Sequence, residues 1–219
     1  MPLDSYVNGP YLGTTRNPFS YEKVEQLERD VSTPWLTMDQ ITQQLNLFND
    51  ESQDDYLSGL ELATRMAIED YLGMTIFSIK WRTYYGAYNG MSGTQTCLDL
   101  PEVTQGQCGV TLNQLVYYSK DNPPVPVVVN PLTYWYDPTG NKVIVNSLPD
   151  EVNQVVTNPI VLTYTTGANR LASYPVIQQA GLMLLTHLYN NRSNTFNGTL
   201  HEIPFGVAQL LRPYKPLVM

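Results

Sequence analysis

The chain has 219 residues, of which 12 are Lys or Arg and 20 are Asp or Glu, giving a formal net charge of −8 at pH 7. This length predicts one domain, or one domain with a sizeable insertion. The acidic balance, without any cluster of Lys and Arg, excludes tight nucleic-acid binding, which needs cations to displace counterions from phosphates. Charged residues make up only 15% of the chain and tyrosines number 16, a composition that favours polar, uncharged contact surfaces between subunits.

Residues 1–35 carry scattered prolines and tyrosines but no sustained hydrophobic period. We expect an extended N-terminal arm that orders against a neighbouring subunit, with a partly disordered terminus as the alternative. Within the arm, the charged segment 21–30 predicts a helical turn or two, and Tyr6 and Tyr11 are candidate inter-subunit residues. The arm has no apolar signal segment, and no run approaches the ~20 apolar residues that span a bilayer. We therefore expect a soluble protein without membrane contact.

Residues 36–74 predict two helices that form part of a helical core. Thr37 is a suitable N-cap for the first, short helix. After an acidic loop, Asp54 and Asp55 begin a second helix, where carboxylates oppose the positive end of the helix dipole. Its apolar positions recur with the 3.6-residue helical period, and Gly73 ends it.

Residues 75–167 predict an inserted β domain. Runs of β-branched and aromatic residues are short and are separated by turn residues, a pattern typical of an antiparallel sheet or a small sandwich. A polar hairpin tip is expected at 87–95 and a turn at 137–140. The expected strands are 76–85, 96–100, 110–119, 133–136, 142–145 and 160–164.

Residues 168–219 predict C-terminal helices that complete the helical core. Pro175 suits the first position of a helix, and the segment 176–189 is apolar nearly all round, as in a buried helix. Gly181, in its middle, costs about 1 kcal/mol relative to Ala, which the close approach of another element would explain. A short amphipathic helix is expected at 203–214. The predicted fold class is therefore α+β, a small helical bundle with an inserted antiparallel β-sheet or small sandwich.

Several motifs of the chain, taken in order, resemble those of one protein family. They are Asp54-Asp-Tyr-Leu-Ser-Gly-Leu60 with Ala67-Ile-Glu-Asp-Tyr-Leu-Gly73, Ile79-Lys-Trp-Arg82, Leu98-Asp-Leu-Pro101, Leu162-Thr-Tyr-Thr-Thr-Gly167, Pro175 to Arg192, and Ile203-Pro-Phe-Gly-Val207 through Leu210-Leu-Arg-Pro-Tyr214. In combination they are similar to the head-tail connector proteins of tailed phages, also called adaptor or head-completion proteins. The resemblance covers roughly residues 37–216. The arm and the 87–95 hairpin lie outside it.

The resemblance implies a homo-oligomeric ring, usually twelve-fold, that docks on the portal protein in the virion neck after assembly in the host cytoplasm. It also implies a channel through which DNA passes without specific binding, and a platform for the tail or for a second adaptor or tail-terminator protein. In this family the C-terminal segment commonly engages the portal; a terminal helix folded onto its own core is the alternative. The portal-binding residues implied are Ile203, Pro204, Phe205, Val207, Leu210, Leu211 and Tyr214.

Several single residues allow both a functional and a structural interpretation. Arg65 and Glu69 are spaced i, i+4, so they form either a surface ion pair worth under ~0.5 kcal/mol or a contact with the next subunit. His187 stands among leucines and is more consistent with a core or interface residue than with a ligand. Cys97 and Cys108 are more consistent with free thiols than with a disulfide.

Neither a metal site nor a cofactor is predicted. Asp50, Ser52, Asp54 and Glu61 match part of a calcium-binding loop, but Asp55 stands where the sharp turn needs glycine. Helix capping and a solvated loop are the better account of these residues. The two histidines lie far from the two cysteines, so zinc-ligand spacing is absent.

Catalysis has little support in the sequence. It contains no nucleophile elbow, phosphate-binding loop or His-Glu-x-x-His motif. Asp99 and Glu102 are the carboxylate pair that glycoside hydrolysis would use, but we expect no enzyme. The alternative function is a β-rich binding module or tail protein, whose exposed tyrosines hold a saccharide or another virion protein.

Overall fold

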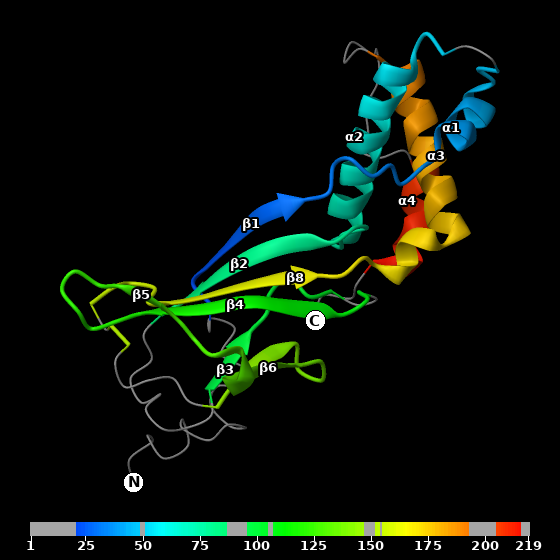
Figure 1. Ribbon diagram of the computed structural model, residues 1–219. Coiled ribbons are helices and arrows are strands. Elements are labelled where there is room, and N and C mark those ends of the chain that lie inside the picture. The colour runs from blue at the N-terminus through cyan, green and yellow to red at the C-terminus, as the bar shows by residue number, and fades with distance from the viewer. Residues whose placement is uncertain are drawn as a thin grey trace. The chain divides into compact units, whose positions relative to one another are not determined.

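The computed structural model shows an α+β protein that divides into two compact units, here called the β unit and the helical unit (Figure 1). The β unit comprises Met1–Arg29, Ile79–Val103 and Gly109–Gly167, and the helical unit Asp30–Ser78, Thr104–Cys108 and Ala168–Met219. The structure describes residues 21–48, 51–86, 96–104, 107–146, 152–153, 155–192 and 205–215. The predicted fold class is confirmed. The expected hairpin tip at 87–95 lies outside the described residues.

The β unit contains two antiparallel sheets, one of five strands in the order β1-β2-β8-β4-β5 and one of three in the order β3-β7-β6. Six of these strands lie close to predicted ones, whereas β1 (Lys23–Arg29) and β5 (Pro126–Val128) were not predicted. The strands are β1 Lys23–Arg29, β2 Ile79–Tyr85, β3 Thr96–Asp99, β4 Val110–Tyr118, β5 Pro126–Val128, β6 Tyr134–Asp137, β7 Lys142–Val145 and β8 Ile160–Thr166.

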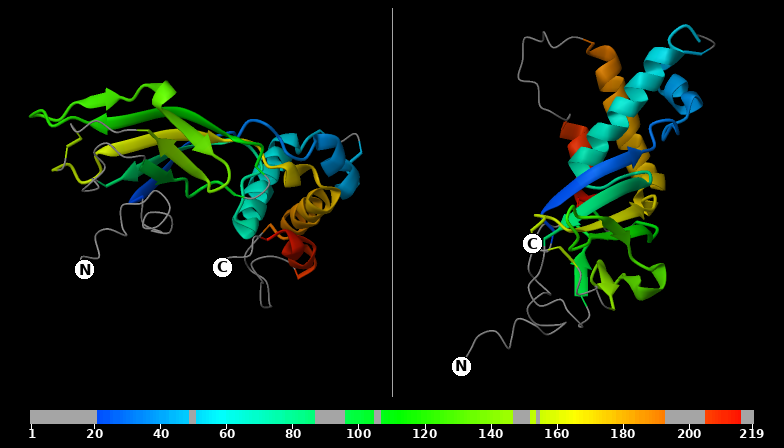
Figure 2. Two further views of the ribbon diagram at one scale, coloured as in Figure 1. Left: turned by 90° about the horizontal axis from the view of Figure 1, so that it is seen from below. Right: turned by 60° about the vertical axis from the view of Figure 1, so that its left-hand side comes forward.

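The two sheets pack as a small sandwich, which Figures 1 and 2 show as separate layers. Side chains alternate between the two faces of a strand, and every second residue of β8, including Leu162 and Tyr164, is buried. These side chains pack against buried residues of the smaller sheet such as Leu98 and Val143. The opposite face of the larger sheet, which includes Thr163, is turned away from this core.

Strand β1 corrects the expectation of a helical turn at 21–30. It pairs antiparallel with β2, from Lys23 opposite Tyr84 to Arg29 opposite Ile79, with an irregularity between Gln26 and Glu28. The local sequence is charged and short, which suits an edge strand because charges there discourage pairing with other chains. Its strand conformation depends on a partner far along the chain, so local periodicity could not reveal it.

The described part of the helical unit contains four α-helices, whose placement follows local signals (Figure 1). Thr37 and Gln40 form a capping box at the first helix. Gly73 ends the second helix at φ 63°, a conformation that glycine adopts without strain. In the described part of the chain, no helix is both long and apolar enough to span a membrane. The helices are α1 Met38–Leu45, α2 Asp54–Leu72, α3 Pro175–Asn190 and α4 Phe205–Leu211, followed by a short 3-10 turn at Arg212–Tyr214.

Gly181 of α3 allows the close approach of Trp35, as its cost to the helix suggested. A Cβ atom placed at Gly181 would lie 2.7 Å from Cζ3 of Trp35. The indole is 8% exposed, and its Nε1 donates a hydrogen bond to the carbonyl of Ala172 at 2.9 Å. The ring is held on two sides and has little freedom to withdraw.

We therefore expect Gly181→Ala to lower the free energy of unfolding by up to about 2 kcal/mol. Overpacking a core costs about 1–3 kcal/mol, and replacing glycine in a helix returns about 1 kcal/mol. Gly59→Ala is the matched control, because Gly59 lies in α2 with nothing within 4 Å of its would-be Cβ. That control should gain up to about 1 kcal/mol. Urea unfolding of both variants measures the difference, and equal gains would refute the packing account.

Candidate interaction surfaces

Arg65 and Glu69, the candidate inter-subunit pair on α2, are both buried within the helical unit. The Arg65 side chain is 1% exposed; its Nη1 donates to the carbonyl of Thr33 at 2.9 Å and its Nη2 to that of Asp30 at 2.6 Å. The guanidinium also lies 4.9 Å from the ring centre of Phe77. The expectation of a surface pair facing a neighbour is therefore corrected for this structure: Arg65 anchors the segment 30–33.

Two buried carboxylates of α2 satisfy backbone N–H groups. Glu69 Oε1 accepts from the amide of Ile76 at 2.6 Å. Glu61 Oε1 accepts from the amides of Trp35 at 2.9 Å and Leu36 at 3.2 Å. Because buried N–H groups are costly to leave unpaired, these glutamates hold the segments that enter and leave the helical unit. Glu61, the last position of the partial calcium loop, thus has a structural role, since its carboxylate accepts these two backbone hydrogen bonds.

The predicted portal-binding stripe is largely core in this structure. Val207 and Leu211 of α4 are 0% exposed and belong to the apolar core of the helical unit. Leu210 and Tyr214 are half-buried. The Tyr214 ring packs edge-on against the Tyr174 ring, with 5.9 Å between the ring centres. The expectation of an exposed apolar stripe is therefore corrected for Val207 and Leu211, which pack on their own chain.

Other predicted site residues lie outside the described part of the structure. These are Tyr6, Tyr11, Asp50, Ile203 and Pro204, together with the side chain of Phe205. Their proposed contacts, with a neighbouring subunit for the tyrosines and with the portal for the C-terminal residues, therefore stay predictions.

The end of α3 is tied to the beginning of α2 by a small polar cluster. The Arg192 guanidinium lies 4.6 Å from the ring centre of Tyr56 and 4.7 Å from that of Tyr189. Both the Arg192 Nη2 and the Tyr189 hydroxyl donate to Gln53 Oε1, at 2.9 and 3.0 Å. His187 is half-buried one turn before Asn191, whose Nδ2 lies 3.3 Å from the His187 Nδ1. These contacts give the residues a structural role.

The two cysteines and the two candidate carboxylates each have a defined local environment. Cys97 and Cys108 are free thiols, and burial raises the pKa of Cys97. Asp99 Oδ1 is paired with Lys142 Nζ at 2.8 Å, while burial raises the pKa of Glu102. Across the described residues, no three His, Cys, Asp or Glu side chains are grouped to hold a metal ion.

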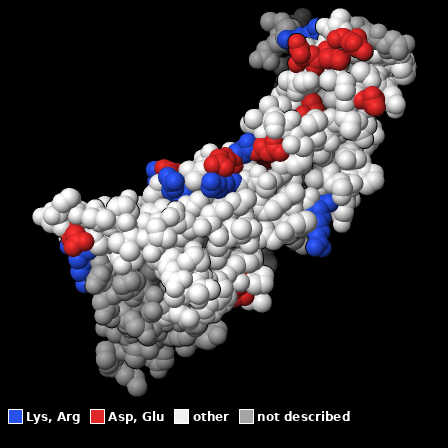
Figure 3. Space-filling view, viewed as in Figure 1, with Lys and Arg blue, Asp and Glu red and all other residues white. Residues whose placement is uncertain are grey.

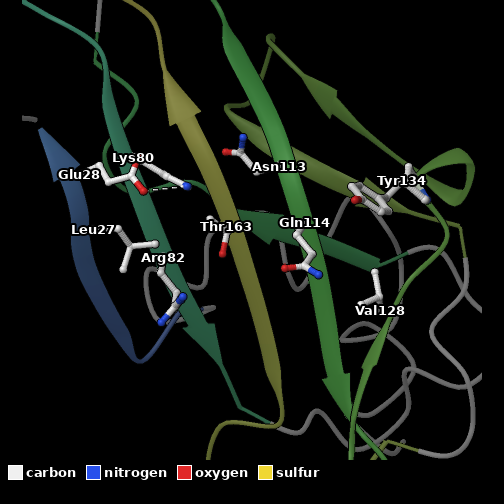
Figure 4. A pocket seen from close by; sticks show the side chains of 10 residues that line it. Leu27, Glu28, Lys80, Arg82, Asn113, Gln114, Val128, Tyr134 and Thr163 are labelled. Carbon is white, nitrogen blue, oxygen red and sulfur yellow. Dashed lines mark hydrogen bonds and ion pairs between the residues drawn. The ribbon is translucent and has the colours of Figure 1, made fainter. Parts of the chain in front are cut away.

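A depression of about 590 Å³ crosses the face of the larger sheet that is turned away from the core (Figure 4). We call it the sheet trough. Its polar floor comes from β2, β4 and β8, whereas Leu27 and Val128 supply apolar groups at the strands on either side. Leu132, next in the chain to the lining residue Pro131, is 88% exposed. The lining residues are Leu27, Glu28, Lys80, Arg82, Asn113, Gln114, Val128, Pro131, Tyr134 and Thr163.

Arg82 is the second cation of the sheet trough, and its charge attracts Glu25 on the neighbouring strand without a direct ion pair. Lys80 Nζ is paired with Glu28 Oε1 at 3.0 Å (Figure 4), whereas Arg82 makes no hydrogen bond or ion pair with any residue that the structure describes. Glu25, opposite Arg82 in the sheet, is engaged by the Tyr84 hydroxyl at 2.7 Å and by Lys23. Sequence reasoning missed this site, although Lys80 and Arg82 alternate with apolar residues and so share one strand face.

The helical unit presents a second surface where α2 begins, which we call the acidic turn. Figure 3 shows Asp and Glu side chains gathered there. Among the described residues, Glu51 and Asp55 are exposed and Asp54 is half-buried. Phe48, just before them, is 66% exposed, and Tyr56 just after is 40% exposed. Exposed aromatic side chains beside carboxylates are typical of a contact surface.

Comparison with known proteins finds similar folds among solved structures. No protein-family model matches the chain, and no curated protein matches it. A chain from the neck of an empty gene transfer agent (GTA) particle, computed with C6 symmetry, shares 17% identity with a TM-score of 0.57. A chain of the virion of a native GTA particle shares 18% identity with a TM-score of 0.54, and one from the native GTA neck, computed with C12 symmetry, 17% with a TM-score of 0.51. Each comparison covers 90% of this chain and 97% of the other. The chain thus shares the fold of these particle proteins over nearly its whole length.

Proposed function

We propose that the chain is a structural subunit of the neck of a tailed phage or related particle. Copies form a ring that docks on the portal protein, continues the DNA channel and provides the platform for the tail. The observation that carries this proposal is the shared fold: it covers 90% of this chain and 97% of a chain from a GTA particle neck. The ordered motifs between residues 37 and 216 point independently to head-tail connector proteins.

The ring and its partners follow from the same reasoning. The GTA necks were computed with C6 and C12 symmetry, and head-to-tail interfaces close into rings when the rotation permits. We propose twelve copies, located in the virion neck after assembly in the host cytoplasm. The role is non-enzymatic, and the tail side receives the tail or a second adaptor or tail-terminator protein. The net charge of −8 suits a channel through which DNA passes without binding.

We keep the C-terminal segment 203–214 as the proposed portal contact, with a changed set of contact residues. Val207 and Leu211 hold α4 to the core. Leu210 and Tyr214, which remain partly exposed, would then meet the portal together with Ile203, Pro204 and Phe205. Such a segment fits a mode in which a short helix lies in an apolar groove of its partner.

The alternative, a β-rich module that holds a saccharide with exposed tyrosines, has lost its main support. Tyr85, Tyr117, Tyr134 and Tyr164 of the β unit are all buried in the sandwich core. Burial also raises the pKa of Tyr164. These four aromatic rings stabilise the unit and are not exposed to hold a saccharide.

Electron microscopy of the purified protein, alone and mixed with its portal protein, tests the proposal. We expect rings, either free or seated on the portal, with one symmetry axis through a central channel. Light scattering gives the matching mass in solution. A chain that stays monomeric alone, with portal and with tail proteins would overturn the proposed function.

A further inference from the structure

We propose that the sheet trough of one copy binds the acidic turn of the next copy, and that this head-to-tail contact closes the ring. The inference deepens the proposed function and rests on it. It names the two surfaces that meet, one on the β unit and one on the helical unit of a different molecule.

The first argument is the state of Arg82 on the trough floor. An arginine side chain bound to a carboxylate forms paired, charge-assisted hydrogen bonds. Lys80 is ion-paired with Glu28. Arg82 is attracted by the charge of Glu25 on the neighbouring strand, but among the described residues no carboxylate forms an ion pair or a hydrogen bond with its guanidinium. The amide side chains of Asn113 and Gln114 and the hydroxyl of Thr163 also line the trough and supply further hydrogen-bonding groups. The trough is therefore built for a partner that brings a carboxylate.

The second argument is where such carboxylates stand on this chain. Glu51, Asp54 and Asp55 fall within five positions at the beginning of α2. The helix dipole accounts for acidic residues in the first turn, but Glu51 lies before the helix, and its exposed charge has no such cause. Figure 3 shows this gathering of negative charge on the helical unit.

The third argument is that both surfaces carry exposed apolar groups beside their charges. Phe48 and Tyr56 flank the carboxylates of the acidic turn. Val128, which lines the trough on β5, is 57% exposed, and Leu132, next in the chain to the lining residue Pro131, is 88% exposed. Charge alone supplies steering and register, whereas apolar burial supplies most of the affinity. The two surfaces complement each other in both respects. Because they are two different surfaces of one chain, the same contact can form between each copy and the next.

Charge reversals test this contact. We expect Arg82→Glu and Glu51→Lys each to raise the concentration at which half of the chains assemble by at least about tenfold, as reversing one partner of an interfacial charge pair does. Glu51 lies before α2, so its variant leaves the helix intact; Asp55→Arg is the second acidic variant. Arg170→Glu is the matched control: Arg170 is exposed and lies outside the trough. Circular dichroism of each monomer checks that the fold is kept.

A mixture of the two single variants gives the sharpest result. In a head-to-tail ring, Arg82→Glu and Glu51→Lys subunits that alternate place a reversed trough against a reversed acidic turn, and an intact trough against an intact turn. We therefore expect the equimolar mixture to recover rings with an even number of subunits. Mass photometry measures their mass, either for the free rings or for rings bound to portal.

Three results would overturn the inference. The first is normal assembly of Arg82→Glu with unchanged DNA retention. The second is loss of assembly with no recovery in the mixture. The third is normal assembly of Arg82→Glu with weaker DNA retention, which would assign the trough to DNA. Wild-type rings in these cases would leave the proposed function standing. If the wild-type chain forms no ring under any of these conditions, both proposals fail.

Discussion

Arg65→Met should lower the free energy of unfolding of the monomer by about 3–6 kcal/mol. Hydrogen bonds from a charged donor contribute about 1.5–3 kcal/mol each, and this variant removes those to Thr33 and Asp30. Methionine keeps the apolar stem, so the loss reports the guanidinium. Urea unfolding measures this loss at protein concentrations too low for assembly, since assembly would itself stabilise the folded state.

Two comparison variants sharpen this experiment. Arg65→Lys should also be destabilised, because an ammonium group is a point charge that cannot reproduce the planar fork of the guanidinium. Arg170→Met, at an exposed position, should stay within about 0.5 kcal/mol of the wild type. If Arg65→Met unfolds like the wild type but fails to assemble, Arg65 is an inter-subunit residue after all.

Leu211→Ala should lower the free energy of unfolding by about 2–5 kcal/mol, as expected for a large side chain removed from a closed core. Leu211 is fully buried, so truncation leaves a cavity between α4 and the rest of the helical unit. Leu210→Ala is the matched control. Its side chain is half-buried. We expect a smaller loss of stability, under about 2 kcal/mol, because this side chain buries less apolar area in the folded protein than Leu211 does.

The same two variants separate core packing from portal binding. Portal capture by pull-down should fall for Leu210→Ala while its monomer stays folded. For Leu211→Ala, capture should fall in proportion to the unfolded fraction. A stable Leu211→Ala monomer that no longer captures portal would show that this side chain faces the portal and would refute its assignment to the core.

The helices and most strands could be predicted because their signals are local. Thr37 caps α1 through atoms three residues away, and Gly73 ends α2 by its own backbone conformation. Strand β7 was predicted with its observed bounds, since β-branched residues between turn signals identify it. Each of these depends on neighbours along the chain, which a single sequence displays directly.

Strand β1 and the candidate surfaces depended on contacts that the sequence does not display. The charged segment 23–29 becomes a strand because β2 offers it a hydrogen-bonding edge. Arg65 and Glu69 have the spacing of a surface pair, yet the segments 30–33 and 76 cover them. A helix-period pattern gives the face on which a residue lies, but not what packs against that face.

The sequence by itself thus determined the fold class, the ends of the main helices and the apolar faces of the main elements, because periodicity and capping are short-range physics. Only the tertiary structure decided that Val207 and Leu211 are core residues and that Arg65 is a buried anchor. It also brought Arg82, Gln114 and Thr163 together in one trough. Burial and charge pairing arise between segments distant in the chain, so only the folded arrangement distinguishes a core stripe from a contact surface.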